Sequence, residues 1–252
     1  MPARGTTRPV TLVSFSGIDG AGKSTQINAL CQRLHKMGVR VTLIRFWDDV
    51  SRLKAIRESA GHKLFKGDKG IGTPEAPITR KDKNVRSWPM TCIRLALYFF
   101  DALSARSSVN RALRSNADVI IFDRYCYDEL ANLDLHNPLL RSYVALLLKI
   151  VPTLDKSFLL DAEPLHARMR KPEYPLDFVY ENRAAYLQLQ QSTGRLTVIL
   201  PSSVEEVERS IWRHILESLH WPSNAGEGGA HSIDIQYTEA HALEGPPIRP
   251  AA

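Results

Sequence analysis

Residues 17–24 read GIDGAGKS, and they give the strongest indication of how this chain folds. It matches the pattern G-x-x-x-x-G-K-[ST] in full. The apolar run 10–16 before it predicts a buried strand, and the segment 24–37 after it carries its apolar residues on one helical face. Glycines let the backbone curl so that N–H groups point inward at phosphate oxygens, and the positive end of the following helix adds to that field. The stretch therefore predicts a P-loop.

The side chains of this loop predict a nucleotide and a metal ion as ligands. Lys23 can reach the β- and γ-phosphates of ATP, and the Ser24 hydroxyl can ligate Mg²⁺. The residues expected to bind ATP are Gly17, Ile18, Asp19, Gly20, Ala21, Gly22, Lys23, Ser24 and Thr25. The alternative is a glycine-rich turn that binds nothing, and the lysine, the serine and both flanking elements argue against it.

Five short apolar runs, several of them rich in β-branched residues, alternate with helical patterns along the chain. The expected strands are residues 10–16, 39–45, 118–122, 156–160 and 196–200. The expected helices are residues 24–37, 51–60, 91–115, 128–133, 138–150, 163–171, 178–191 and 203–219. Buried strands that alternate with helices pair in parallel and are covered on both faces. The pattern therefore predicts an α/β fold, a P-loop three-layer sandwich with a five-stranded parallel sheet and helices on both faces.

The length and composition fit one kinase-sized domain. The chain has 252 residues, 44% of them hydrophobic, and we expect one domain over residues 10–220. Residues 1–9 are expected to be flexible, and 61–90 to form a basic excursion with little regular structure. Residues 221–252 hold few large apolar side chains, so we expect a disordered tail.

Charge and cysteine usage narrow the class of partner. The formal net charge of +6 suits a polyanionic ligand, but no dense Lys/Arg tract with aromatic residues predicts nucleic-acid binding. No apolar run approaches the roughly 20 residues of a membrane helix.

The three cysteines Cys31, Cys92 and Cys126 are widely spaced and odd in number. They predict reduced thiols and a cytoplasmic protein.

Two further segments carry charged residues that suit phosphate chemistry. Asp123 and Arg124 follow a predicted strand and should share the sheet edge with the P-loop, where the carboxylate can hold Mg²⁺ or orient an acceptor and the arginine can clamp an acceptor phosphate. Arg168 and Arg170 precede a proline-broken turn, and we interpret residues 168–177 as a lid that neutralises charge during transfer. The alternatives are a plain surface ion pair and a solvated helix end.

Four segments together resemble the thymidylate kinase family of nucleoside monophosphate kinases. They are Phe15 to Gln26, Asp123 to Tyr125, Leu160 to Pro164 and Arg183 to Tyr186. The resemblance implies a kinase that uses ATP and Mg²⁺ to phosphorylate dTMP or a related nucleoside monophosphate. It also implies a homodimer with the helix 91–115 as one face.

The same resemblance implies the roles of single residues. The residues implied to be catalytic are Lys23, Asp123, Arg124, Arg168 and Arg170, and those implied to hold the metal are Ser24 and Asp123. The residues expected to contact the acceptor are Asp19, Arg45, Phe46, Phe100 and Arg124, of which the resemblance itself implies Asp19 and Arg124. Asp19 would face the sugar and Arg124 the phosphate of the acceptor.

The acceptor half departs from the family pattern. Asp49 stands where one family form has a phosphate-binding arginine, and Asp128 stands where a serine is expected. Phe46 and Phe100 can stack a base, although aromatic residues near strand ends are more often core residues. Two other functions therefore stay open: a P-loop kinase with a nucleoside, sugar or lipid-linked alcohol as acceptor, and a non-catalytic ATP-binding regulatory protein.

Overall fold

A parallel β-sheet forms the centre of the structure, a computed structural model that describes residues 10–46 and 88–218. Within these ranges five parallel strands pair in the order β2-β3-β1-β4-β5. The strands are β1 (Thr11–Ser16), β2 (Val41–Arg45), β3 (Val119–Asp123), β4 (Lys156–Leu160) and β5 (Thr197–Ile199). The predicted α/β class and five-stranded parallel sheet are confirmed.

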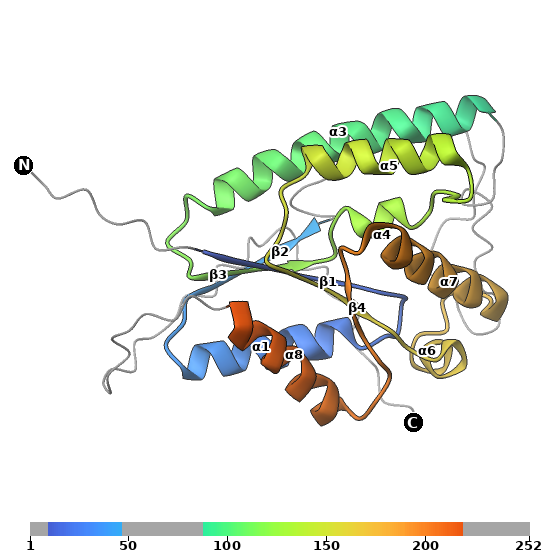
Figure 1. The fold of residues 1–252 in the computed structure, drawn as a ribbon. Helices are drawn as coiled ribbons and strands as arrows, with labels where there is room; N and C mark the ends of the chain where they lie inside the picture. Colours follow the sequence, from blue (N-terminus) through green and yellow to red (C-terminus); the bar gives the residue numbers. More distant parts are fainter. Residues whose placement is uncertain (1–9, 47–87, 219–252) are drawn as a thin grey trace, which may run out of the picture.

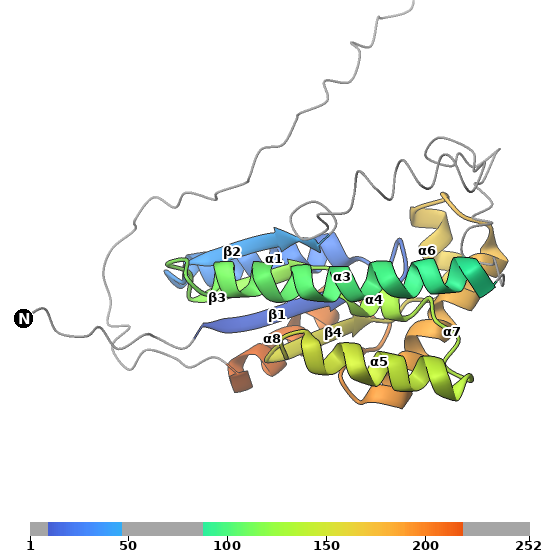
Figure 2. The same ribbon diagram turned by 90° about the horizontal axis from the view of Figure 1, so that it is seen from above.

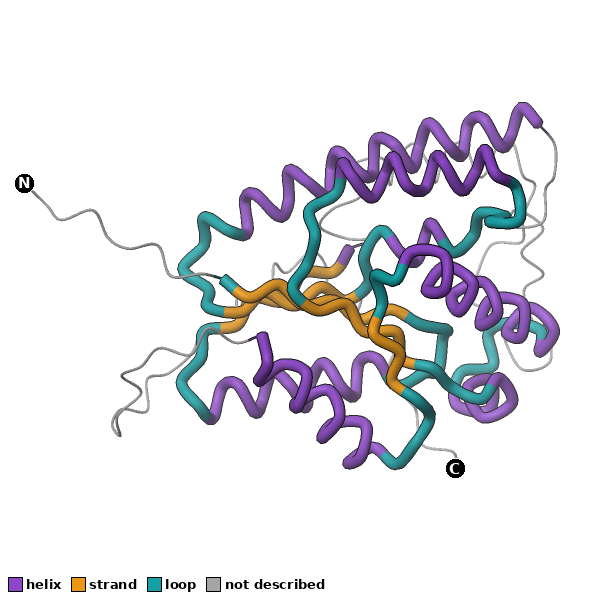
Figure 3. The backbone as a smooth tube through the Cα atoms, in the orientation of Figure 1, coloured by secondary structure: helices purple, strands orange, loops and turns teal. Residues whose placement is uncertain are grey.

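Helices cover both faces of this sheet (Figures 1 and 3). They are α1 (Lys23–Lys36), α3 (Trp88–Ala112), α4 (Tyr127–Leu130), α5 (Pro138–Ile150), α6 (Pro164–Arg170), α7 (Leu176–Thr193) and α8 (Val204–Ser218). The connection from β1 runs toward one edge of the sheet, whereas those from β2, β3 and β4 run toward the other, so right-handed crossovers place their helices on opposite faces. Accordingly α1 and α8 pack on one face, and α3 and α5 lie side by side on the other (Figure 2).

Alternation along the central strands divides the core into two layers. Val13 and Phe15 of β1 face the layer under α1 and α8, whereas Leu12 faces the layer under α3 and α5. The six residues of β1 are all buried, as expected for the middle strand of a covered sheet. Ser16 falls on the α3 and α5 side by the same alternation, and its hydroxyl donates a hydrogen bond to the Asp128 carboxylate on that side.

The element boundaries agree with the sequence predictions to within a few residues. β4 and α5 match, and α5 begins where the Asn137 side chain accepts a hydrogen bond from the Leu139 amide, just ahead of Pro138. α3 begins at Trp88, so the end of the expected excursion 61–90 is helical. α4 is shorter than predicted and ends at Leu130. The expected helix 51–60, the segments 1–9 and 221–252, and most of 61–90 lie outside the described residues.

Candidate active site

The P-loop joins the end of β1 to the start of α1 through three glycines with positive φ. Gly17, Gly20 and Gly22 have φ of 140°, 82° and 89°, values that side chains with a Cβ rarely adopt. A Cβ on Gly17 would lie 2.5 Å from the Leu160 carbonyl oxygen, and one on Gly20 would lie 2.1 Å from the Ala167 carbonyl oxygen. The loop therefore curls as predicted, and its tip lies against the backbone of α6.

Lys23 is buried inside this curl. Its ammonium Nζ donates to the carbonyl oxygens of Gly17 at 2.8 Å and Ile18 at 2.9 Å. Burial and the nearby positive charge of Arg124 lower the pKa of Lys23 to about 8, against the opposing effect of nearby carboxylates. Ser24 and Thr25, at the N-terminal end of α1, are exposed. The loop and the helix start thus offer one cation, two exposed hydroxyl residues and the positive end of a 14-residue helix.

Arg124 lies beside the loop, between two carboxylates. Its guanidinium Nη2 donates to Asp19 Oδ1 at 2.6 Å, and Nη1 donates to Asp128 Oδ1 at 3.0 Å. Burial alone would lower the pKa of Arg124, but Asp128 and other negative groups raise it. The residue has a φ of 71°, which costs roughly 1–2 kcal/mol outside glycine. Strained backbone of this kind persists where surrounding contacts hold it, often at functional sites.

Asp123 and Arg45 end neighbouring strands at the same edge of the sheet. Asp123 closes β3 and is in register with Phe15 of β1 and Arg45 of β2. The carboxyl ends of β1, β2 and β3 therefore bring together the loop, a carboxylate and an arginine, as the parallel sheet predicted.

The predicted lid, residues 168–177, is formed by the end of one helix, a turn and the start of the next. Arg168 and Arg170 belong to the last turn of α6, where Arg168 Nε donates to the Tyr174 carbonyl oxygen at 3.1 Å and Arg170 Nε to that of His166 at 3.2 Å. Lys171 Nζ lies 3.7 Å from Asp19 Oδ1. α6 and the turn after it thus lie beside the P-loop at Asp19 and Gly20 (Figure 1).

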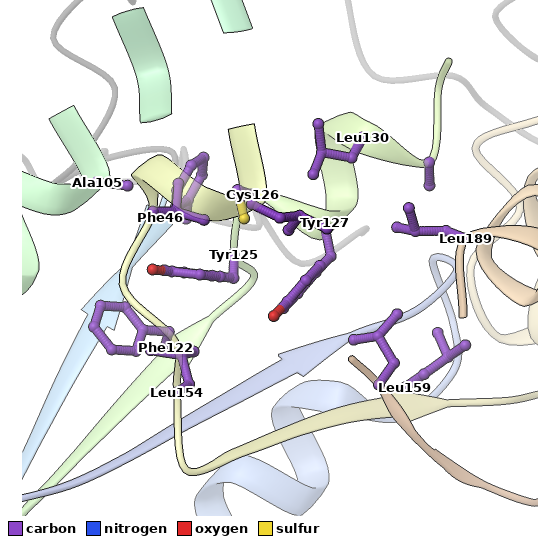
Figure 4. Close-up of a cluster of buried hydrophobic side chains, with 14 of the residues drawn as sticks. Phe46, Ala105, Phe122, Tyr125, Cys126, Tyr127, Leu130, Leu154, Leu159 and Leu189 are labelled. Carbon is purple, nitrogen blue, oxygen red and sulfur yellow. The ribbon is translucent and has the colours of Figure 1, made fainter. Parts of the chain in front are cut away.

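The structure corrects one predicted contact with the acceptor. Phe46 is fully buried, and its ring lies edge-on to Tyr125 with centroids 6.0 Å apart (Figure 4). It is a core residue, so its ring is not exposed to a base. Phe100 is 56% exposed and packs edge-on against Phe99, on the side of α3 opposite to the buried Ala102. Its contact with a base stays a prediction.

Asp128 belongs to the site although no motif of the sequence indicated it. Its Oδ2 accepts from Ser16 Oγ at 2.7 Å and the Tyr125 amide at 3.2 Å, and its Oδ1 accepts from Arg124 Nη1 and from Tyr186 Oη at 2.7 Å. Ser16 and Tyr186 lie 112 and 58 positions away along the chain, so no local pattern could predict these contacts. The one available signal was an acid in place of an expected serine.

A second ion pair closes the far side of the site. Arg183 of α7 forms a bidentate pair with Asp161, which follows β4, with Nε–Oδ1 and Nη2–Oδ2 distances of 2.6 and 2.7 Å. Such paired bonds fix the guanidinium plane as well as its position. The pair therefore ties α7 to the carboxyl end of β4, directly beside the loop.

Comparison with known proteins extends this description. No family model matches the chain. A protein of Archaeoglobus fulgidus, named probable thymidylate kinase, is 28% identical over 217 residues, which are 82% of this chain and 95% of that protein. A thymidylate kinase of Prochlorococcus marinus is 33% identical over 119 residues, 47% of this chain and 49% of that enzyme.

The fold has a counterpart among solved structures. The crystal structure of thymidylate kinase from Ehrlichia chaffeensis superimposes with a TM-score of 0.53 at 18% identity, covering 83% of this chain and 99% of that one. The chain is similar to thymidylate kinases in sequence and in fold. The expected resemblance is confirmed by the sequence match to the archaeal relative and by the shared fold. In the part of the chain that the structure describes, each helix is too short or too polar to span a membrane.

Proposed function

We propose that this protein is a nucleoside monophosphate kinase that transfers the γ-phosphoryl group of ATP to dTMP or a related monophosphate. The observation that carries the proposal is the pairing of a P-loop with Arg124, through Asp19 of that loop. Lys23 would then be the cation on the nucleotide side of the site, and Arg124 the cation on the acceptor side. The relatives named thymidylate kinase support the same function.

The loop residues fit a triphosphate. At Gly17 and Gly20 a side chain would collide with backbone oxygen atoms, so the curl depends on glycine. The Lys23 ammonium now bonds to carbonyl groups of the loop. Phosphate oxygens are better acceptors for a cation than neutral carbonyls are. Lys23 would therefore hold the β- and γ-phosphates, with the amides of the loop around them.

Ser24 and Asp123 are the residues that would hold Mg²⁺. A hydroxyl oxygen and a carboxylate oxygen suit Mg²⁺, which in kinases is bound by one or two protein groups together with substrate phosphates and water. When bound, the ion neutralises phosphate charge that builds up during transfer.

The chain's own cations would act on the acceptor and on the transferring group. Arg124 would bind the acceptor phosphate, with Arg45 at the neighbouring strand end, and Asp19 would contact the sugar. Arg168 and Arg170 would neutralise charge on the phosphoryl group as it transfers. Positioning and charge neutralisation are sufficient for this reaction, and no covalent intermediate on the protein is required.

An acceptor panel tests this function. Purified protein with MgATP is given dTMP, dUMP, other nucleoside monophosphates, thymidine and a sugar, and ADP and phosphorylated products are separated by chromatography. We expect a nucleoside diphosphate from dTMP or a close relative. Phosphorylation of thymidine or the sugar alone would favour a kinase with another acceptor. ATP binding without any product would favour a regulatory protein.

We further propose that the enzyme is a cytoplasmic homodimer. α3 carries exposed apolar side chains along the side opposite to its buried one: Ile93, Phe99, Phe100 and Leu103. A contiguous apolar stripe on a surface helix suits an interface between two copies of the chain. Sedimentation of the wild type and of Phe100→Asp tests the dimer, since the charged variant should sediment as a monomer.

The cysteines bear on the compartment. Within the described residues the three cysteines form no disulfide, which suits a reducing compartment.

A further inference from the structure

We propose that Asp128 is a positioning residue for phosphoryl transfer, because it anchors Arg124 while the acceptor phosphate replaces Asp19. The inference rests on the proposed function. It concerns the two carboxylates that share one guanidinium group. Asp128 bonds to Nη1 and Asp19 to Nη2.

The two carboxylates differ in their freedom to move. The Asp128 side chain is 1% exposed and accepts three further hydrogen bonds, from Ser16, the Tyr125 amide and Tyr186. The Asp19 side chain is 23% exposed and lies on the loop, and its other charged neighbours are Lys23 and, at 3.7 Å, Lys171. Turning Asp19 away from Arg124 leaves a carboxylate that water or the acceptor's sugar can satisfy, whereas moving Asp128 would leave four donors without their acceptor. Asp19 is therefore the carboxylate that yields.

An acceptor phosphate makes this exchange necessary. A phosphate that binds Arg124 at Nη2 would come within a few ångströms of Asp19, and like charges at that distance repel. When Asp19 turns away, Nη2 is free for the phosphate and Nη1 stays on Asp128. The guanidinium then keeps its place through the exchange, and the phosphate meets an arginine that is already oriented.

Asp128 also connects the parts of the site that must be aligned. Its partners come from the end of β1, which leads into the P-loop, from the segment after β3, and from α7, which follows the lid. The serine expected at this position has one hydroxyl oxygen and cannot accept four hydrogen bonds in two directions. The carboxylate thus fixes the spacing between the nucleotide loop and the acceptor arginine, to which transfer is sensitive at about the 1 Å level.

Steady-state kinetics of Asp128→Asn test this role, with Tyr186→Phe as the matched control. The asparagine keeps the size but removes the charge that holds Nη1, whereas the phenylalanine removes one donor and leaves the carboxylate on Arg124. We expect Asp128→Asn to lower kcat/KM for dTMP at least roughly tenfold while KM for MgATP changes less than about twofold. Tyr186→Phe should change kcat/KM for dTMP less than about threefold. Equal losses toward both substrates, or equal losses in both variants, would overturn the proposal.

The NMR signals of the Arg124 guanidinium give a readout that does not depend on turnover. Assigned by their absence in Arg124→Lys, they should report slow rotation of the Nη1 amino group about its bond to Cζ in the wild type and in Tyr186→Phe. Rotation of Nη1 should be fast in Asp128→Asn, in which Asp19 still holds Nη2. Slow rotation in Asp128→Asn would refute the anchor even if no monophosphate proved to be a substrate, so this failure is distinct from failure of the proposed function.

Titration of the wild type with dTMP covers the case in which Asp128→Asn does not fold. We expect the Nη2 protons of Arg124 to shift while the Nη1 protons keep the signature of the bond to Asp128. Movement of the Nη1 protons alone would mean that Asp128, and not Asp19, is displaced, which would overturn the proposal.

Discussion

Replacing Gly20 by alanine tests the close approach of the P-loop to α6. Gly20 has a φ of 82°, and a Cβ there would lie 2.1 Å from the carbonyl oxygen of Ala167 and 2.8 Å from its carbonyl carbon. Gly22 offers a matched control, because its φ is 89° and a Cβ there has nothing within 4 Å. Both alanines adopt a left-handed backbone, but only the one at residue 20 meets a neighbour.

The structure sets the expected magnitudes. A left-handed conformation costs a residue with a Cβ roughly 1–2 kcal/mol, and this term applies to both variants. At residue 20 the loop and α6 must also separate by about 1 Å before the contact is tolerable, an overpacking that costs roughly 1–3 kcal/mol more. We therefore expect Gly22→Ala to lower the free energy of unfolding by about 1–2 kcal/mol and Gly20→Ala by about 2–5 kcal/mol.

Urea unfolding of the nucleotide-free protein measures both values on the same scale. Gly38→Ala serves as a control away from the loop, since Gly38 has a φ of 71° and open space around the added methyl group. It should lose as much stability as Gly22→Ala and keep normal turnover. If Gly20→Ala were no less stable than Gly22→Ala, the P-loop would not lie against α6 as described.

Three further predictions follow from the charged groups of the site. Because the pKa of Lys23 is about 8 in the nucleotide-free protein and phosphates favour its charged form, nucleotide binding should take up a proton above pH 8. The affinity for MgATP should then fall about tenfold from pH 7 to 9. Calorimetry in two buffers of different ionisation enthalpy measures the proton uptake, and Lys23→Met should take up no proton. Arg168→Ala or Arg170→Ala should lower kcat at least about tenfold with little change in KM for ATP, and unchanged kcat in both would remove these arginines from the mechanism. Arg183→Lys replaces a bidentate pair with Asp161 by a single contact and should lower the free energy of unfolding by about 0.5–1.5 kcal/mol; an unchanged urea midpoint would contradict this.

The fold could be predicted from the sequence because its signals are local. The loop pattern and the β-branched runs place β1, and the pair Asn137–Pro138 marks the start of α5. The predicted ends of helices differ from the observed ones where the sequence carries a weak capping signal or where the prediction did not use it. α3 begins earlier than predicted, and α7 runs to Thr193, where Gly194 with a φ of 62° ends it.

The acceptor side of the site could not be predicted from local patterns. Phe46 and Phe100 are both aromatic and close to functional segments, but packing decides their roles, since one ring is enclosed by Tyr125 and its neighbours and the other lies on the outside of α3. Asp128 is the converse case. The local sequence gave no hint of its partners, because Ser16 and Tyr186 reach it only after the sheet and α7 have assembled.

A single-turnover reaction tests the central claim most directly, namely that one site holds MgATP on the P-loop and an acceptor phosphate at Arg124. Wild-type protein in excess over γ-labelled MgATP is mixed with dTMP, quenched and resolved into nucleoside diphosphate and inorganic phosphate, with Lys23→Met as a control for contaminating kinases. The label should pass to the diphosphate in the wild type and stay on ATP in the variant. Label found in inorganic phosphate alone, or equal transfer by Lys23→Met, would contradict the account.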